Sequence, residues 1–180
     1  AAREFEDLVR QHGATPATIA VIGGIARVGL TEDQRELIAS DDTVEKLSVR
    51  DLPTVMAKGG HGATTVAATA FLAAQAGIRV FATGGLGGVH DGASQSFDES
   101  ADLSTLAHAP VAVISAGVKS VLDIQATLER LETLSVPVLG FGTDVFPRFR
   151  LPRSEYPVDH RVDSAQQVAD VMNHAQQLGL

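Results

Sequence analysis

The feature that most constrains the fold of this chain is the alternation, in its second half, of short apolar runs with longer helix-like stretches. Apolar runs at 78–82, 111–116 and 136–141 are interleaved with stretches at 120–134 and 164–177 that have helical spacing. Strands that are joined by long helices make right-handed crossovers, and such strands lie parallel to one another. The pattern predicts an α/β fold: a mostly parallel sheet with helices on both faces, an α/β/α arrangement.

The first half contains shorter elements that extend this prediction. Thr31 and Gln34 have the spacing of a capping box at the start of a helix. No internal repeat or low-complexity linker divides the chain, so we expect a single domain over residues 1–180. The other expected elements are helices over 2–11, 31–40 and 63–75, a helix that starts near Pro53, a hairpin over 17–29 and a short strand at 46–48.

Composition excludes several classes of function. The chain has no cysteine, which rules out disulfides, thiolate metal sites and thiol nucleophiles. Its net charge is -8 and it has no basic run, so we expect no nucleic-acid partner. The longest apolar stretch, 66–76, carries Thr69 and Gln75 and is too short to span a bilayer. With no signal peptide visible, we expect a cytoplasmic protein without a membrane partner.

Lys119 is the strongest single candidate for chemistry. It follows the apolar run 111–116, where a buried strand is expected to end and a helix to begin. Open α/β sheets place their ligands at this edge. A helix N-terminus and apolar surroundings would disfavour the ammonium form, which would leave a nucleophilic amine. The alternative is a lysine that simply extends from a strand end into solvent.

The segment 83–92 contains five glycines and ends close to His90. Such a loop lets the backbone approach a ligand and turn its N–H groups toward a phosphate. A flexible connection between a strand and a helix explains the same glycines. A second glycine-rich turn, 59–62, precedes Thr64 and Thr65. Either threonine would cap a helix, and the N-terminus of that helix would face an anion. Capping without an anion is the simpler interpretation.

Charged residues nearby have two interpretations each. Lys46 and Arg50 would supply positive charge to an anion site, although solvated surface positions are the commoner outcome for both. Asp98, Glu99 and Asp102 would suit a hard divalent ion, whereas helix capping by Asp98 or Ser100 explains the cluster equally well. The six histidines show no zinc-binding spacing.

Longer motifs carry a resemblance that covers nearly all 180 residues. The chain resembles the pseudouridine-5'-phosphate glycosidase family, also called indigoidine-synthase-A-like. The matching stretches, in family order, are PATIAVIGG, KLSVRDLP, GATTVAAT, GIRVFATGGLGGVHDGA, FDESADL, AGVKSVLDI, LERLETLSVPVLGFGTD and RVDSA. These motifs are long and peculiar to the family.

The resemblance implies reversible cleavage of a carbon–carbon glycosidic bond, which yields uracil and ribose 5-phosphate, by a homotrimeric enzyme that uses Mn²⁺ or another divalent cation such as Mg²⁺. Carried over by position, Lys119 is similar to the family's Schiff-base lysine and Asp98 to its manganese-associated aspartate. Lys46 resembles a second lysine that contacts the substrate. The other positions that match substrate-binding residues are Val66, Thr83, His90, Ser100, Ala101 and Asp102.

A lysine suits this chemistry for a reason that does not depend on the resemblance. A C-glycoside has no exocyclic oxygen to protonate, so the two-carboxylate route of ordinary glycosidases cannot assist the departure of the base. Once the ribose ring opens, C1 accepts an amine, and the resulting iminium delocalises electrons while the carbon–carbon bond breaks.

The chain also departs from the family pattern. The family's general acid is a glutamate that precedes the matching stretches, and a further active-site asparagine follows them; Glu4 and Glu6 are not equivalents of that glutamate. Asp91 stands where relatives commonly carry a basic residue. Two alternatives therefore stay open: a C-glycosynthase that joins ribose 5-phosphate to an aromatic acceptor, and an inactive ribose-phosphate-binding fragment or scaffold.

Overall fold

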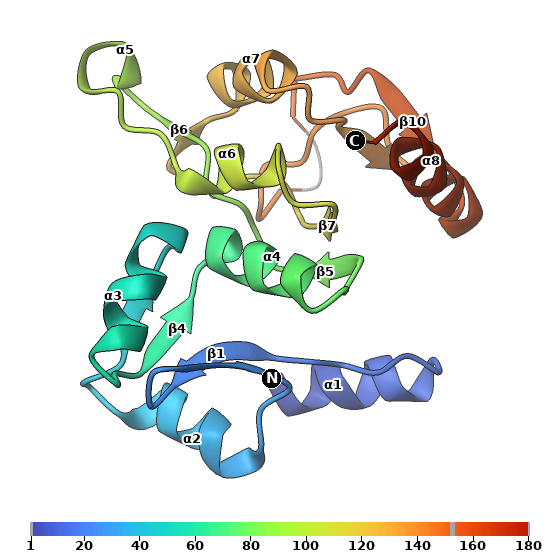
Figure 1. The fold of residues 1–180 in the computed structure, drawn as a ribbon. Coiled ribbons are helices and arrows are strands. Elements are labelled where there is room, and N and C mark those ends of the chain that lie inside the picture. Colours follow the sequence, from blue (N-terminus) through green and yellow to red (C-terminus); the bar gives the residue numbers. More distant parts are fainter. Residues whose placement is uncertain (1, 152–153, 180) are drawn as a thin grey trace. The chain divides into compact units, whose positions relative to one another are not determined.

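The computed structural model describes residues 2–151 and 154–179. The chain divides into two compact units, which we call unit 1 (residues 1–76) and unit 2 (residues 77–180) (Figure 1). Each unit combines helices and strands, so the predicted α/β class is confirmed. The proposed single domain over residues 1–180 stays a prediction.

Unit 1 is built on one four-stranded sheet with the strand order β2-β1-β4-β3. Strand β1 pairs antiparallel with both β2 and β4, whereas β3 pairs parallel with β4. The elements are α1 (Ala2–Gln11), β1 (Ile19–Ile22), β2 (Ile25–Val28), α2 (Glu32–Ser40), β3 (Glu45–Leu47), the 3-10 helix η1 (Val49–Asp51), α3 (Leu52–Ala57), β4 (Gly62–Thr64) and α4 (Val66–Gln75).

The hairpin and the capping box predicted for this half are confirmed. Ile19 pairs with Val28 at the open end of the hairpin. At the start of α2, the Thr31 side chain accepts from the Gln34 N–H and the Gln34 side chain accepts from the Thr31 N–H. Both features are local in sequence, which is why the sequence predicted them.

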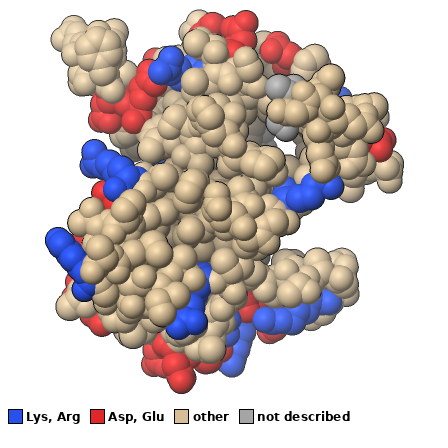
Figure 2. Space-filling view, viewed as in Figure 1, with Lys and Arg blue, Asp and Glu red and all other residues tan. Residues whose placement is uncertain are grey.

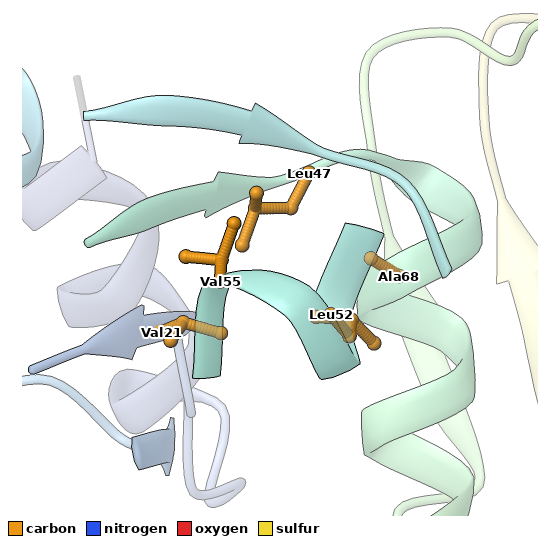
Figure 3. Packing of buried hydrophobic residues seen from close by; sticks show 5 residues of the cluster. All are labelled: Val21, Leu47, Leu52, Val55 and Ala68. Carbon is orange, nitrogen blue, oxygen red and sulfur yellow. The ribbon is translucent and has the colours of Figure 1, made fainter. Parts of the chain in front are cut away.

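The strand β4 was not predicted, because residues 63–64 were expected to belong to the helix that follows. A side chain at Gly62 would collide with Leu47 of the adjacent strand, so the two strands pack without a gap. Leu47, Val21, Leu52, Val55 and Ala68 form the buried core of this unit, and Figure 3 shows them converging from the sheet, α3 and α4. Strand pairing with distant residues overrode the local helical pattern.

A buried carboxylate joins α1 to the rest of unit 1. Glu6 is 7% exposed and accepts hydrogen bonds from Thr18, Arg10 and Arg35 at 2.7 to 3.1 Å. Burial by itself raises the pKa of Glu6, but the hydrogen bonds from Thr18 and Arg10 and the positive charge of Arg35 outweigh it and hold the pKa below its ordinary value. Glu6 therefore stays ionised inside the unit.

The described residues of unit 2 form three two-stranded pairings and several helices. The pairs β5-β7 and β9-β10 are parallel, and β6-β8 is antiparallel. The elements are β5 (Val80–Ala82), β6 (Val89–His90), α5 (Ala93–Ser96), α6 (Ala101–Leu106), β7 (Ala112–Ile114), β8 (Leu122–Asp123), α7 (Ile124–Thr133), β9 (Leu139–Phe141), β10 (His160–Val162) and α8 (Ala165–Leu178).

The apolar runs of the second half form strands, as predicted, but the pairing is more mixed than expected. The sheet of unit 1 holds two antiparallel pairings and one parallel pairing, so it is not mostly parallel. In unit 2 the helix expected from Ser120 begins at Ile124, because residues 122–123 form β8 and Asp123 caps the helix. Among the described residues, no helix has the length and apolarity that a membrane crossing requires.

Candidate functional site

The centre of the glycine-rich loop of unit 2 is buried. Residues 85–89 lie in the interior of the unit and Thr83 and His90 are half-buried, whereas Gly84, Asp91 and Gly92 are exposed. Leu86 and Val89 are 8% and 6% exposed. Burial of this kind argues against a flexible surface connection and in favour of a loop whose conformation is held by its neighbours.

The segment that carries Lys119 lies along one side of this loop. The Thr83 N–H donates to Ile114 O at 2.9 Å and so extends the parallel pairing of β5 with β7. Farther along, the Leu86 N–H donates to Gly117 O at 2.9 Å, and the Lys119 N–H donates back to Leu86 O at 3.1 Å. The backbone of Lys119 is therefore attached directly to the centre of the loop.

The position of Lys119 confirms part of the expectation and corrects another part. It follows strand β7, as predicted, and its side chain is exposed. Because α7 begins only at Ile124, Lys119 does not lie in the first turn of a helix, and the predicted helix N-terminus beside its amine is wrong. Its exposure also contradicts the apolar burial that was expected for its side chain.

A glycine before Lys119 is required by the packing of this segment. Gly117 has a φ of +85°, a left-handed conformation that favours glycine. A Cβ at this position would lie 2.5 Å from Pro147 O. The turn into Lys119 therefore leaves no space for a side chain at Gly117.

The segment 98–102 lies along the other side of the loop. The His90 N–H donates to Asp98 O and the Ser100 N–H donates to Gly88 O, each at 3.0 Å. Ser100 also caps α6, since its hydroxyl accepts from the Asp102 N–H at 3.2 Å. The capping interpretation of Ser100 is confirmed, and the same residue borders the loop.

The three acidic side chains of this segment have separate partners. Asp102 is 5% exposed, and its carboxylate accepts from the Gly87 N–H at 2.7 Å. Glu99 forms an ion pair with Arg130 at 2.8 Å. Asp98 is largely exposed and lies 4.0 Å from Nδ1 of His90. The acidic residues therefore do not converge on one point.

The described residues contain no group of three or more histidine, aspartate or glutamate side chains that could hold a metal ion. A single exposed carboxylate such as Asp98 fits an ion that keeps most of its water ligands, as Mg²⁺ often does. It does not fit an ion enclosed by protein ligands. Asp98 is thus compatible with the predicted divalent cation only in the water-mediated form.

A residue that the sequence reasoning missed contacts the loop from α7. Thr127 is fully buried, and its hydroxyl accepts from the Val89 N–H at 2.9 Å. The available signal was its place on the apolar face of the helix, in line with Ile124 and Leu131, which are also buried. A polar residue at such a position needs a hydrogen-bond partner.

Two of the predicted site residues belong to unit 1. Lys46 is exposed on β3, and Val66 is the half-buried first residue of α4. Thr65 caps α4 by accepting from the Ala68 N–H at 3.4 Å. The remaining predicted residues, Thr83, His90, Asp98, Ser100, Ala101, Asp102 and Lys119, all belong to unit 2.

The glycine-rich turn at 59–62 packs against the hairpin of its own unit. The Gly24 N–H donates to Gly60 O at 2.8 Å, and the Gly23 N–H donates to Nδ1 of His61 at 3.1 Å. Arg50, which was considered as a source of positive charge, is 91% exposed and lies 3.5 Å from the adjacent Asp51. The capping interpretation is confirmed at Thr65, which follows strand β4, and an anion at this helix start stays a prediction.

Charges of both signs are dispersed over the face that Figure 2 draws. Figure 2 shows lysine and arginine side chains in small separate groups on the face that it draws, with acidic side chains between them. The counts, 14 basic and 22 acidic residues, agree with this picture. The expectation that the chain has no nucleic-acid partner stays a prediction.

The chain is similar in sequence to a known family and to proteins of several bacteria. The family described as Indigoidine synthase A like protein matches residues 1–180. A pseudouridine-5'-phosphate glycosidase of Nocardioides sp. is 63% identical over 179 residues, which are 99% of this chain and 58% of that protein. One from Frankia alni is 63% identical over 177 residues, 98% of this chain and 49% of that protein. The chain thus spans about half the length of these relatives.

Two solved structures share the fold. A prealnumycin C-glycosynthase in complex with ribulose 5-phosphate superposes with a TM-score of 0.94 at 42% identity, over 98% of this chain and 58% of that one. An indigoidine synthase A-like protein from Thermotoga maritima superposes with a TM-score of 0.93 at 35% identity, over 99% of this chain and 60% of that one.

Proposed function

This chain belongs to the indigoidine synthase A like family, and on that premise we propose that its protein reversibly cleaves the carbon–carbon glycosidic bond of pseudouridine 5'-phosphate to uracil and ribose 5-phosphate. The observation that carries the proposal is the hydrogen bond from the Lys119 N–H to Leu86 O, at 3.1 Å. It attaches the backbone of Lys119, whose side chain is exposed, to the buried centre of the glycine-rich loop. The relatives that match nearly the whole chain are named for this activity.

In the proposed reaction Lys119 is the nucleophile. In the direction of bond formation, its neutral amine attacks the C1 aldehyde of open-chain ribose 5-phosphate, and loss of water yields an imine whose protonated form accepts the carbon of the base; the C4 hydroxyl of the sugar then displaces the amine and closes the ring. Cleavage runs these steps in reverse: the amine displaces the ring oxygen, the nitrogen lone pair forms the C=N bond as the bonding electrons leave with the base, and water hydrolyses the imine. Lysine suits this role because its ammonium loses a proton far more readily than a guanidinium. By the resemblance, the proton for the departing base comes from the family's glutamate, to which neither Glu4 nor Glu6 is equivalent.

The loop contributes to sugar-phosphate binding in a narrower way than its glycines suggest. Five of its N–H groups are already engaged within unit 2: those of Thr83, Leu86 and His90 by backbone carbonyls, that of Gly87 by Asp102 and that of Val89 by Thr127. We therefore assign the polar contacts to the phosphate and ribose to side chains, with Thr83 and His90 at the two ends of the buried stretch. Ser100 and Ala101, at the start of α6, border the same loop.

Several further assignments rest on the resemblance alone. They are a substrate contact by Lys46, a lining role for Val66, a direct substrate contact by Asp102 and a homotrimer. Two other proposals rest on the sequence pattern: a cytoplasmic location, and a mostly parallel sheet that includes the parallel pairs β5-β7 and β9-β10. For the metal, we propose that Asp98 holds Mn²⁺ or Mg²⁺ through ordered waters. An unchanged Mn²⁺ affinity in Asp98→Asn would contradict that assignment.

A C-glycosynthase is the second candidate function. The solved prealnumycin C-glycosynthase shares 42% identity and a TM-score of 0.94 with this chain. The sugar-phosphate site would be the same in both functions, and only the acceptor pocket would differ. Incubation with ribose 5-phosphate and either uracil or an aromatic polyketide acceptor separates the two, because each function forms a different product.

Reductive trapping tests the central proposal. The complete reading frame that encodes this sequence is expressed, incubated with ribose 5-phosphate and reduced with borohydride. We expect a covalent adduct on Lys119 in peptide mass analysis. Failure to form an adduct in an active preparation, or an adduct on Lys46 alone, would remove Lys119 from the reaction. A protein that binds ribose 5-phosphate without turnover would be an inactive binding fragment or scaffold.

A further inference from the structure

Thr127 is a polar residue in the interior of unit 2, and no step of the proposed reaction uses it. It lies near the start of α7 and is 0% exposed. Its hydroxyl donates to Asp123 O at 2.6 Å and accepts from the Val89 N–H at 2.9 Å. Because the single proton of the hydroxyl is directed at Asp123, the lone pairs of the oxygen face the loop.

This one hydroxyl joins two segments that carry candidate site residues. Val89 belongs to β6, whose next residue is His90, and Asp123 belongs to β8, which follows the Lys119 segment. The two strands also pair directly, with Val89 opposite Asp123 and His90 opposite Leu122. Thr127, which lies on α7, forms hydrogen bonds to the backbone of both strands.

The loop packs directly on the Thr127 side chain. A Cβ at Gly88 would lie 2.5 Å from Oγ1 and 3.0 Å from Cγ2 of Thr127. The backbone at Gly88 therefore approaches as closely as a glycine permits. A change in the shape or polarity of the Thr127 side chain is transmitted to the loop, since no space between them can absorb it.

The loop in turn fixes the position of the Lys119 backbone. Leu86 accepts from the Lys119 N–H at 3.1 Å, and Lys119 O accepts from the Leu122 N–H at 3.1 Å. Lys119 is thus held between the loop and β8, the same two segments that Thr127 bridges. Thr127 contacts neither the amine of Lys119 nor the imidazole of His90 in any of these bonds, so its influence on them would be indirect.

We propose that Thr127 is a positioning residue, whose hydroxyl sets the glycine-rich loop against the Lys119 segment so that the amine and His90 meet the same sugar phosphate. The inference rests on the proposed function for its consequence in catalysis. The structural part of the inference is the hydrogen bond from the Val89 N–H to the Thr127 hydroxyl, and it does not depend on which substrate is bound.

Three variants of α7 separate positioning from a general role in folding. Thr127→Val keeps the branched shape and removes the hydroxyl, which leaves a buried N–H without its acceptor. Thr127→Ser keeps the hydroxyl and removes a methyl group. Thr133→Val is the matched control, because Thr133 makes the same bond to the carbonyl four residues earlier, Glu129 O at 2.9 Å, on the exposed face of the same helix.

The measurements use the complete natural chain, at a temperature where every variant is folded by circular dichroism. For Thr127→Val we expect the rate of imine trapping at saturating ribose 5-phosphate to fall about ten- to a hundredfold, the size of effect that a misplaced reacting group produces. Thr127→Ser should recover most of this rate, and Thr133→Val should match the wild type. Amide exchange at Val89 and His90 should accelerate in Thr127→Val only.

The outcomes distinguish this inference from the proposed function. An unchanged trapping rate in Thr127→Val, or a Thr127→Ser variant as slow as Thr127→Val, would overturn the positioning role. Unchanged exchange at Val89 would overturn it as well, even if no variant reacts. If the wild type itself forms no imine while exchange at Val89 still accelerates in Thr127→Val, the proposed function fails and the structural hold by Thr127 stands.

Discussion

The two glycine-rich turns of the chain look alike in the sequence and differ in the folded protein. The turn at 59–62 in unit 1 packs on the backbone of its neighbouring hairpin. The loop at 83–92 in unit 2 is held by two buried polar side chains, Asp102 and Thr127, and by the segment that carries Lys119. Glycines show that a backbone approaches something closely, and only the neighbouring residues decide whether that place is a site.

Replacement of the lysine beside each turn should give the largest difference between them. Lys119→Ala should abolish turnover, and Lys119→Arg should do the same, because a guanidinium stays charged and forms no imine. Lys58, exposed at the end of α3 beside the turn at 59–62, is the matched control. Steady-state cleavage assays check this, and equal losses in Lys58→Ala and Lys119→Ala would erase the distinction.

Alanine at one glycine of each turn should give the next largest effect. Gly88→Ala forces a methyl group into Thr127, which should cost about 1 to 3 kcal/mol of unfolding free energy and much of the activity. Gly59 has a φ of +69° and open space around it, so Gly59→Ala should cost only about 1 kcal/mol, from backbone strain, with activity kept. Urea unfolding and the cleavage assay measure both. Loss of activity in Gly59→Ala would contradict the assignment.

Replacement of two aspartates that accept hydrogen bonds from backbone N–H groups should give a smaller difference between the two units. Asp102→Ala leaves the buried Gly87 N–H without its acceptor, so we expect a loss of about 1 to 3 kcal/mol and a slower reaction. Asp51→Ala removes a local cap, the bond from the Ser48 N–H at 2.8 Å, and should cost about 1 kcal/mol with little change in rate. If Asp51→Ala slowed the reaction as much as Asp102→Ala, local destabilisation would explain both results.

The smallest effect on activity should come from Glu6, which stabilises unit 1 only. Its pKa is lowered in the folded protein, so its ionisation contributes stability that is complete above the unfolded pKa, near 4.5, and is lost as pH falls through the folded value. Glu6→Gln should lower the unfolding free energy at pH 7 by about 1 kcal/mol, because a neutral acceptor replaces a charged one. Turnover should not change. Wild type and variant should converge in stability at acidic pH, and a constant difference would contradict this.

Features that depend on neighbouring residues were the ones that the sequence predicted correctly. The capping box at Thr31 and Gln34 needs only four consecutive residues, and the structure contains it. The cap at Ser100 and the position of Lys119 after a strand were predicted on the same basis. In each case the hydrogen-bond partners or the apolar run lie within a few residues, so the pattern is visible in the chain itself.

Features that depend on distant partners were missed. Strand β4 has only three residues, and it is stabilised by pairing with β1 on one side and with β3 on the other. The start of α7 was placed too early, since the pairing of β8 with β6 ends the strand at Asp123 and that residue then caps the helix. Short strands have weak local signals, and their stability comes from the ladder that they join.

By itself, the sequence determined the α/β class, the lack of any thiol chemistry and the presence of a lysine after a strand. Only the tertiary structure decided that the acidic residues 98–102 would take separate partners and that Thr127, a residue with no motif around it, would support the loop. The physical reason is the range of the interactions. Capping and periodicity act over one or two turns, whereas a buried N–H donates to whichever distant side-chain oxygen the fold brings within roughly 3 Å, the length of a hydrogen bond.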